Sequence, residues 1–294
     1  MERIEFYRNR TLSERFSVSV DFLKQNWKVL YKNILIGAIP LGIVVAFLAQ
    51  YYQESTLLNI YSGNVNTTIY FIALYIVFAV ILNIYLNAMT GAVLKKYGEG
   101  HLTPATGWSD LSRTMLSLSG KTFVIGLLIC GVIIVFALIL ALIFSFLADG
   151  GTLGAMVVTG AVMFILCIVL IAFLPSLSLT LFPAYFSGTG NRKSLKIAFG
   201  MGFRNWGNVF VTILLAGIIL YVIIVIFSAP KLILALFSPG EIGVLTFLSG
   251  FLAILGNILT YPVFFIFIAF QYFSIVESEQ SLSLQSKVDE FENL

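Results

Sequence analysis

Six uncharged polar side chains lie inside long apolar stretches of the chain, where hydrogen bonding is the main chemistry open to a side chain. Asn83 and Asn87 are spaced to lie one helical turn apart, and the segments LPSLSLTLFP and GNILTYP supply the others. Amides and hydroxyls donate and accept hydrogen bonds without carrying charge at neutral pH. The candidate polar cluster comprises Asn83, Asn87, Ser176, Ser178, Asn257 and Thr260.

Two interpretations of this cluster stay open at the level of sequence. The six side chains could converge on a polar cavity that holds or passes a small or lipid-like ligand. They could instead hydrogen-bond between helices and fill the gaps that Pro175, Pro183 and Pro262 leave. Both interpretations place them facing inward, because backbone groups freed inside a membrane are tolerated only where protein or water satisfies them.

Ionisable residues are missing from the centres of the apolar stretches, and this argues against an enzyme. Proton relays, ion-coupled transport and acid–base catalysis inside a membrane depend on such residues. No hydrolase, zinc or nucleotide motif occurs either. The sequence therefore predicts no catalytic, cofactor-binding or metal-binding residues, and an enzyme would need Glu99, His101 and Asp110 to form a cluster.

Composition identifies the class of protein that must position these residues. Of the 294 residues, 59% are hydrophobic and 11% are charged, against about 25% charged in a soluble domain. About 20 apolar residues span a bilayer as a helix, and six stretches qualify, so the predicted fold class is an all-α integral membrane protein with six spans. The predicted spans are Ile34–Tyr51, Ile69–Leu94, Thr122–Leu147, Leu153–Phe186, Val209–Phe227 and Gly243–Phe273.

The basic residues predict the orientation of these spans. Sixteen of the 17 Lys and Arg residues fall on one side of the predicted topology, and only Lys231 falls on the other. Because cytoplasmic loops carry the excess of Lys and Arg, we expect both termini to be cytoplasmic.

Each odd-numbered span follows a segment with an apolar stripe at helical spacing, which predicts an amphipathic helix at the cytoplasmic interface. The first such helix begins at a capping box formed by Thr11 and Glu14. The first stripe comprises Leu12, Phe16, Val20, Leu23, Trp27, Leu30 and Ile34. Similar stripes comprise Trp108, Leu111, Met115 and Leu118, and then Leu195, Phe199, Trp206 and Phe210.

This recurrence predicts one membrane domain, residues 1–294, built from three parallel helical hairpins. The pseudo-repeats run over residues 11–100, 101–190 and 191–276, followed by a short cytoplasmic tail at 277–294. The first amphipathic helix carries Lys24, Lys28 and Lys32 on its polar side, and we expect these lysines to contact anionic lipid headgroups.

Three segments of the chain resemble segments of known membrane proteins. They are TLSERFSVSVDFLKQNWKVLYKNILI, FRNWGNVFVTIL and FQYFSIVESE. They make the chain similar to YciC-like bacterial six-span membrane proteins and to the membrane-anchor domain of some glycerophosphodiester phosphodiesterases. The resemblance implies a bacterial cytoplasmic (inner) membrane protein. The phosphodiesterase activity does not transfer, because the soluble domain and its catalytic carboxylates and histidines are absent from this sequence.

These observations together favour a non-catalytic inner-membrane component, a scaffold or accessory subunit. Its expected partners are the lipid bilayer, through anionic headgroups, and a membrane protein, with no cofactor and no nucleic acid. The alternative is a transporter or channel for an uncharged or amphiphilic small solute, lined by the polar cluster.

Reporter fusions test the predicted orientation. A reporter that is active only outside the cell should be inactive when fused within 98–118 or 188–208, and active when fused beside Lys231, because the positive charge lies on the cytoplasmic side. An active reporter in either of the first two connections would contradict the three-hairpin topology.

Overall fold

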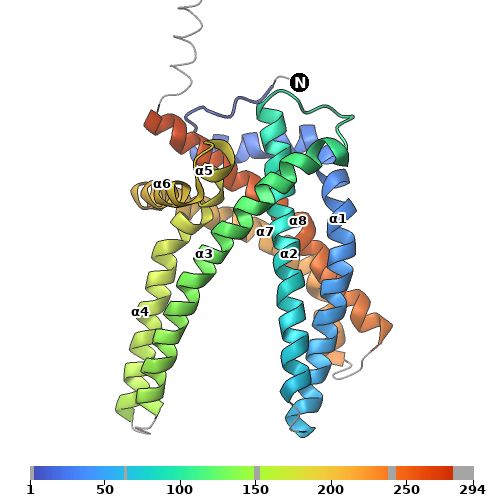
Figure 1. Cartoon of the computed structure of the whole chain (residues 1–294), viewed down its shortest axis with the longest axis vertical. Helices are drawn as coiled ribbons and strands as arrows, with labels where there is room; N and C mark the ends of the chain where they lie inside the picture. The colour runs from blue at the N-terminus through green and yellow to red at the C-terminus, as the bar shows by residue number, and fades with distance from the viewer. Residues whose placement is uncertain (1–2, 63–64, 149–152, 238–242, 281–294) are drawn as a thin grey trace, which may run out of the picture. The chain divides into compact units, whose positions relative to one another are not determined.

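The computed structural model describes residues 3–62, 65–148, 153–237 and 243–280, and the regular elements in these ranges are all helices. No strand occurs within them. The helices are α1 (Leu12–Ser62), α2 (Val65–Gly98), α3 (Trp108–Ala148), α4 (Leu153–Ser178), α5 (Leu181–Phe186), α6 (Asn191–Arg204), α7 (Trp206–Phe237) and α8 (Val244–Gln280) (Figure 1).

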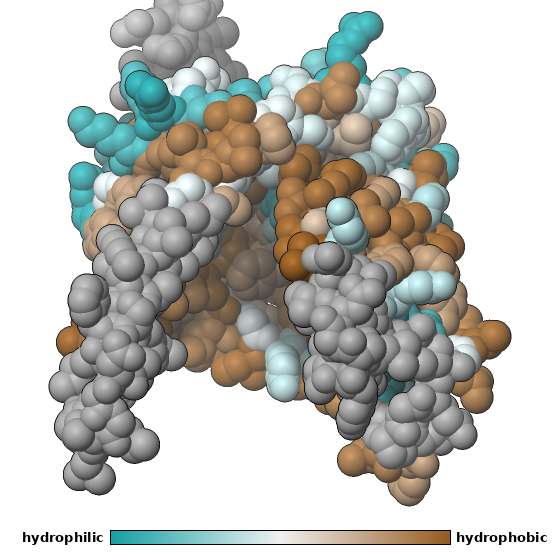
Figure 2. All heavy atoms as spheres, turned by 60° about the horizontal axis from the view of Figure 1, so that its bottom comes forward, coloured by the Kyte–Doolittle hydropathy of each residue, from teal (hydrophilic) through white to brown (hydrophobic). Residues whose placement is uncertain are grey.

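Six stretches of the described helices are long and apolar enough to cross a membrane, which confirms the all-α class and the number of candidate spans. Large hydrophobic side chains are exposed along these helices, and apolar residues cover much of the face seen in Figure 2. Soluble monomers rarely expose apolar surface on this scale. The stretches are Leu12–Tyr51, Ile69–Gly98, Trp108–Gly131, Ile168–Phe186, Trp206–Leu234 and Val244–Gln280.

Several helices extend beyond the predicted boundaries. The segment predicted to be an amphipathic helix and the first predicted span form one helix, α1, which runs from Leu12 to Ser62 and turns along its length rather than staying straight (Figure 1). At the other end of the chain, α8 continues to Gln280 and buries Glu277, so residues 277–280 belong to a helix rather than to the predicted tail. The rest of that tail lies outside the described residues.

The fourth span is interrupted where prolines are frequent. Helix α4 ends at Ser178, two residues intervene, and α5 follows as a short helix that contains Pro183. Proline lacks the N–H that continues a helix and its ring crowds the preceding turn, so a break here is expected.

Two helix starts are capped as their sequences favour. The amide of Thr11 donates to Glu14 Oε2 at 2.7 Å, and the amide of Glu14 donates to Thr11 Oγ1 at 3.4 Å, which confirms the predicted capping box. Before α3, the amide of Gly107 donates to Asp110 Oδ2 at 2.9 Å. These bonds satisfy amides that have no partner in the first helical turn.

The chain divides into two compact units, and the first contains residues 1–119 and 214–294. Helix α1 packs against both α2 and α8 in this unit, and the buried side chains of Phe22, Leu30, Met89 and Phe270 lie among them. A non-helical N-terminal strap, residues 3–11, joins the same core.

Aromatic packing and hydrogen bonds hold the strap to the ends of α2 and α8. Phe6 is buried and stacks on Tyr97 and Phe273, with ring centroids 5.6 and 4.6 Å away. Arg3 Nη2 donates to the carbonyl of Gly98 at 2.7 Å, and the amide of Arg10 donates to Ser274 Oγ at 3.1 Å. The strap is therefore part of the folded core of the first unit.

The second unit contains residues 120–213, in which α6 packs against α4 and α5. Lys121 Nζ donates to the carbonyl of Ala184 at 2.5 Å, and the hydroxyls of Thr122 and Tyr185 are hydrogen-bonded. Gly202 of α6 approaches α4 so closely that a Cβ at this position would lie 2.4 Å from Ser176 Cα.

Trp206 and Tyr31 bond to carbonyls in the turns before the prolines of α4 and α8. Trp206 Nε1 donates to the carbonyl of Ala172 at 3.0 Å, three residues before Pro175. Tyr31 Oη donates to the carbonyl of Leu259 at 2.6 Å, three residues before Pro262. Each accepting carbonyl is next to the one, four residues before the proline, that loses its helical donor.

Replacing Gly202 with alanine tests the close approach of α6 to α4. Gly202→Ala should lower the midpoint of thermal unfolding in detergent by several degrees, because the clash is with backbone rather than with a flexible side chain. Gly207→Ala is the matched control, since nothing lies within 4 Å of a Cβ there and alanine favours a helix. Equal midpoints for the two variants would contradict the packing.

Candidate functional site

Asn83 and Asn87 of α2 form a hydrogen-bonded network with Tyr261 of α8. Asn87 Nδ2 donates to Asn83 Oδ1 at 2.8 Å, and Tyr261 Oη donates to Asn87 Oδ1 at 3.0 Å. Asn87 is buried. These side chains therefore join α2 to α8, as the helix-packing interpretation requires.

The same network borders a small cavity, so the polar residues do more than join helices. This Asn83 pocket has a volume of about 210 Å³ and is lined by residues of α1, α2 and α8. Its lining includes Val45, Leu82, Asn83, Ile254, Asn257 and Tyr261. Mostly apolar walls with a few convergent polar groups are typical of small-molecule sites.

A second cavity, the Lys231 pocket, lies along the same face of α8 and has a volume of about 120 Å³. Asn257 and Ile254 line both pockets. The other polar residues of the Lys231 pocket are Gln50, Tyr75, Lys231 and Thr246.

The structure brings together Asn83, Asn87 and Asn257 but gives the other predicted residues local roles. Thr260 is buried, and its hydroxyl donates to the carbonyl of Gly256 in its own helix at 2.8 Å. Ser176 and Ser178 belong to the second unit. Ser178 donates to the carbonyl of Pro175 at 2.8 Å, whereas the buried Ser176 Oγ has no partner among the described residues.

The three lysines predicted to contact lipid are exposed on α1, and Lys24 lines a pocket. Lys28 Nζ lies 5.8 Å from the centre of the Trp27 ring. Val20 and Trp27, which belong to the predicted apolar stripe, are 39% and 53% exposed, whereas Leu30 and Ile34 of the same stripe are fully buried. The part of the stripe before Leu30 therefore leaves two apolar side chains exposed to solvent or lipid beside the lysines.

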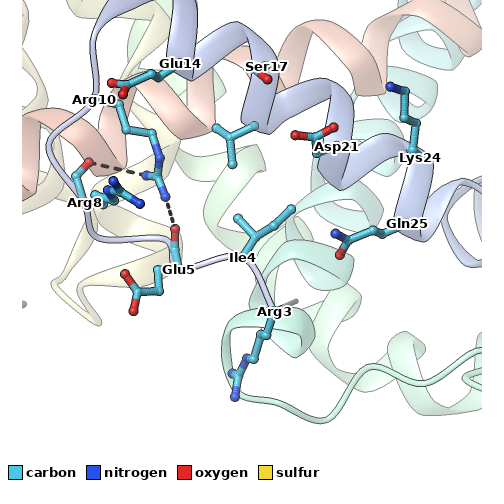
Figure 3. A pocket seen from close by; sticks show the side chains of 11 residues that line it. Arg3, Ile4, Glu5, Arg8, Arg10, Glu14, Ser17, Asp21, Lys24 and Gln25 are labelled. Atoms are coloured by element: carbon cyan, nitrogen blue, oxygen red, sulfur yellow. Dashed lines mark hydrogen bonds between the residues drawn. The ribbon is translucent and has the colours of Figure 1, made fainter. Parts of the chain in front are cut away.

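Lys24 belongs to a strap pocket of about 700 Å³ between the N-terminal strap and the first turns of α1. Figure 3 shows the strap passing along α1, with labelled side chains from both segments around the space between them. Four cationic and three acidic side chains line the pocket. They are Arg3, Arg8, Arg10, Lys24, Glu5, Glu14 and Asp21.

Two of the four cations are held by backbone oxygens of the protein. Arg10 Nη1 donates to the carbonyl of Phe6 at 2.9 Å, and Arg3 bonds to Gly98. Figure 3 shows that Arg10 also donates to the carbonyls of Glu5 and Arg8. Burial, and after it the neighbouring Arg8, lowers the pKa of Arg10. The side chains of Arg8 and Lys24 make no hydrogen bond or ion pair within the described part of the chain, which leaves them available to a ligand.

Glu99 and His101 lie in the connection between α2 and α3, and Asp110 lies in the first turn of α3. His101 Nδ1 lies 3.8 Å from Glu99 Oε2 on the exposed surface, while Asp110 caps α3. Among the described residues, no group of three His, Cys, Asp or Glu side chains could hold a metal ion.

Sequence reasoning missed Tyr261, Lys231 and the arginines of the strap as site residues. Tyr261 lies four residues after Asn257, so helical spacing could have placed it on the same face. The strap arginines precede the first helix, and no periodicity indicates which helices an irregular segment will contact.

Comparisons of the chain with protein-family models, with curated proteins and with solved structures found no match. Functional inference therefore depends on the residues and geometry described above.

Two asparagine variants separate the packing role from the pocket role. Asn87→Leu should destabilise the protein by about 1 kcal/mol or more, because it leaves the Tyr261 hydroxyl and Asn83 without their partner. Asn257→Leu should change stability little, since Asn257 is exposed and donates only to Ala253 of its own helix. Thermal unfolding in detergent measures both, and a larger loss for Asn257→Leu would contradict these roles.

Proposed function

We propose that this protein is a non-catalytic, multi-pass membrane component that binds the phosphate-bearing headgroups of anionic lipids at the strap pocket. By holding lipid there it serves as a scaffold or accessory subunit in the membrane. The observation that carries the proposal is that Arg8 and Lys24, whose side chains make no hydrogen bond or ion pair with other described residues, both line a pocket of about 700 Å³.

The mixed charge of the pocket suits a headgroup that combines a phosphate with hydroxyls. Guanidinium and ammonium groups bind phosphate oxygens through charge-assisted hydrogen bonds, and a basic residue near an anionic surface contributes about 1 kcal/mol. The hydroxyls of a glycerol headgroup would donate to acceptors such as Asp21, which lies one helical turn from Lys24. Glu14 is already engaged by Thr11 and competes less for the cations.

The surface beside the pocket supports a position at the membrane interface. Val20 and Trp27 expose apolar side chains next to Lys24 and Lys28 on α1. Tryptophan and lysine beside each other are typical of interfacial helices, in which the apolar body enters the acyl region and the charge stays in water. The turn in α1 gives its first part a different direction from the rest of the helix (Figure 1).

Three contacts support the proposed three-hairpin repeat. The second and third predicted amphipathic segments each contact the even-numbered span of the preceding repeat. The first contacts the last span. Tyr31 bonds to α8, and Trp206 bonds to α4. Trp108 stacks on Tyr85 of α2 with ring centroids 5.8 Å apart.

The orientation and location belong to the same proposal. Sixteen of 17 basic residues on one side of the predicted topology support cytoplasmic termini, and the resemblance to YciC-like proteins supports a bacterial inner membrane. The alternative function, passage of an uncharged or amphiphilic solute, is favoured by one observation: Asn257 lines two pockets on the same face of α8.

Lipid titration of the purified full chain tests the headgroup site. In neutral detergent, short-chain phosphatidylglycerol should bind the double variant Arg8→Gln/Lys24→Gln at least tenfold more weakly than the unmodified protein, because two phosphate contacts are lost. Native mass spectrometry, which counts bound lipid, measures the change.

A control variant removes two charges elsewhere. Lys193→Gln/Lys196→Gln loses the same charge from α6 and should bind the lipid as the unmodified protein does, with short-chain phosphatidylcholine as the neutral lipid. Equal binding by the two double variants would show that the strap pocket is not the site.

A further inference from the structure

The Lys231 pocket and the Asn83 pocket follow one face of α8. Thr246, Gly250 and Ala253 line the first, Asn257 lines both, and Tyr261 lines the second. These residues are spaced by three or four positions, as neighbours on one helix face are. At a rise of about 1.5 Å per residue, this face extends roughly 22 Å from Thr246 to Tyr261.

The walls of this face change in character along its length. Around the Asn83 pocket they are mainly apolar, with contributions from Val45, Leu82 and Ile258, and the polar groups are Asn83, Asn257 and Tyr261. The Lys231 pocket is more polar, and Lys231 is the one cation among the described residues that line either cavity. The two pockets thus form a site with a charged end and a largely apolar end.

Lys231 makes no hydrogen bond or ion pair with another described residue. A lysine next to an apolar helix surface is costly when its charge has no partner, whereas an anionic ligand would offset that cost. It is also the one basic residue on the non-cytoplasmic side of the predicted topology. Because Lys231 lies at the end of an apolar track, we expect a ligand whose charged group is attached to an apolar chain.

We propose that these two pockets bind a single-chain amphiphile with an anionic head, the chemistry shared by a fatty acid and a lysophospholipid. The head binds at Lys231, with Gln50 and Thr246 as further polar contacts, and the chain lies along α8 toward Leu82. The side-chain amides of Asn257 and Asn83 hydrogen-bond to an oxygen of the ligand or to a water beside it. This site is separate from the strap pocket and does not depend on the headgroup proposal.

The volumes favour one chain over two. The cavities measure about 120 and 210 Å³ and share Ile254 and Asn257 in their walls. A larger side chain at Ile254 would therefore reduce the space in both pockets.

Equilibrium binding of radiolabelled palmitate to the purified full chain in detergent tests the site. Lys231→Gln should weaken binding about tenfold and Lys231→Arg should retain it, because the arginine keeps the charge. Ile254→Trp should abolish binding, while Leu252→Trp, which alters a partly exposed position on the same helix, should not. Competition by palmitoyl lysophosphatidylglycerol then distinguishes which anionic head is preferred.

Several results would overturn the proposal. Unchanged palmitate binding by Lys231→Gln would show that Lys231 does not bind the anionic head. This result would stand even if Ile254→Trp failed to fold. Equal competition by hexadecyltrimethylammonium would show that the site does not recognise an anion. Arg8→Gln/Lys24→Gln should bind palmitate normally, so a loss in that variant would assign the amphiphile to the strap pocket instead.

Discussion

Backbone hydrogen bonding in apolar surroundings is the constraint on which this structure depends. A helix that crosses a membrane must satisfy its own carbonyls, because lipid offers no donors. Pro175 and Pro262 each remove one donor from the interior of an apolar helix. In both cases an aromatic side chain from another segment, Trp206 or Tyr31, donates to the carbonyl three residues before the proline, which is next to the carbonyl that the proline leaves without a helical donor. These bonds tie another segment of the chain to the turn that contains the freed carbonyl.

The asparagines of the first unit show how one polar group serves packing and another serves a cavity. Asn87 is buried and bonded on both sides, so its contribution is to hold α2 and α8 together. Asn257, one turn before Tyr261, bonds only to its own helix and faces two pockets. A carboxylate or lysine at either position would need a partner for its charge, whereas an amide tolerates both environments. A protein with few charges can thus place polar groups both at helix contacts and on the walls of pockets.

Charge is concentrated instead where the chain leaves the apolar helices. The strap packs Phe6 into an aromatic cluster, and its arginines surround the start of α1. Arg3 and Arg10 donate to carbonyls and stabilise the strap itself, whereas the side chains of Arg8 and Lys24 line the pocket without a hydrogen bond or ion pair among the described residues. The same short segment thus completes the core of the first unit and presents a charged pocket.

Sequence alone determined the all-helical class, the six apolar spans and the capping box at Thr11, because hydrophobicity, chain length and local hydrogen bonding are properties of short segments. It also identified Asn83, Asn87 and Asn257, since polar residues stand out in apolar stretches. Only the tertiary structure decided that these three lie together with Tyr261 while Ser176 and Ser178 belong to another unit. The tertiary structure alone placed the strap against α2 and α8, and placed Lys231 and Asn257 on the wall of one pocket. Contacts between distant segments depend on how helices pack. Helical periodicity carries no information about the partner of a given face.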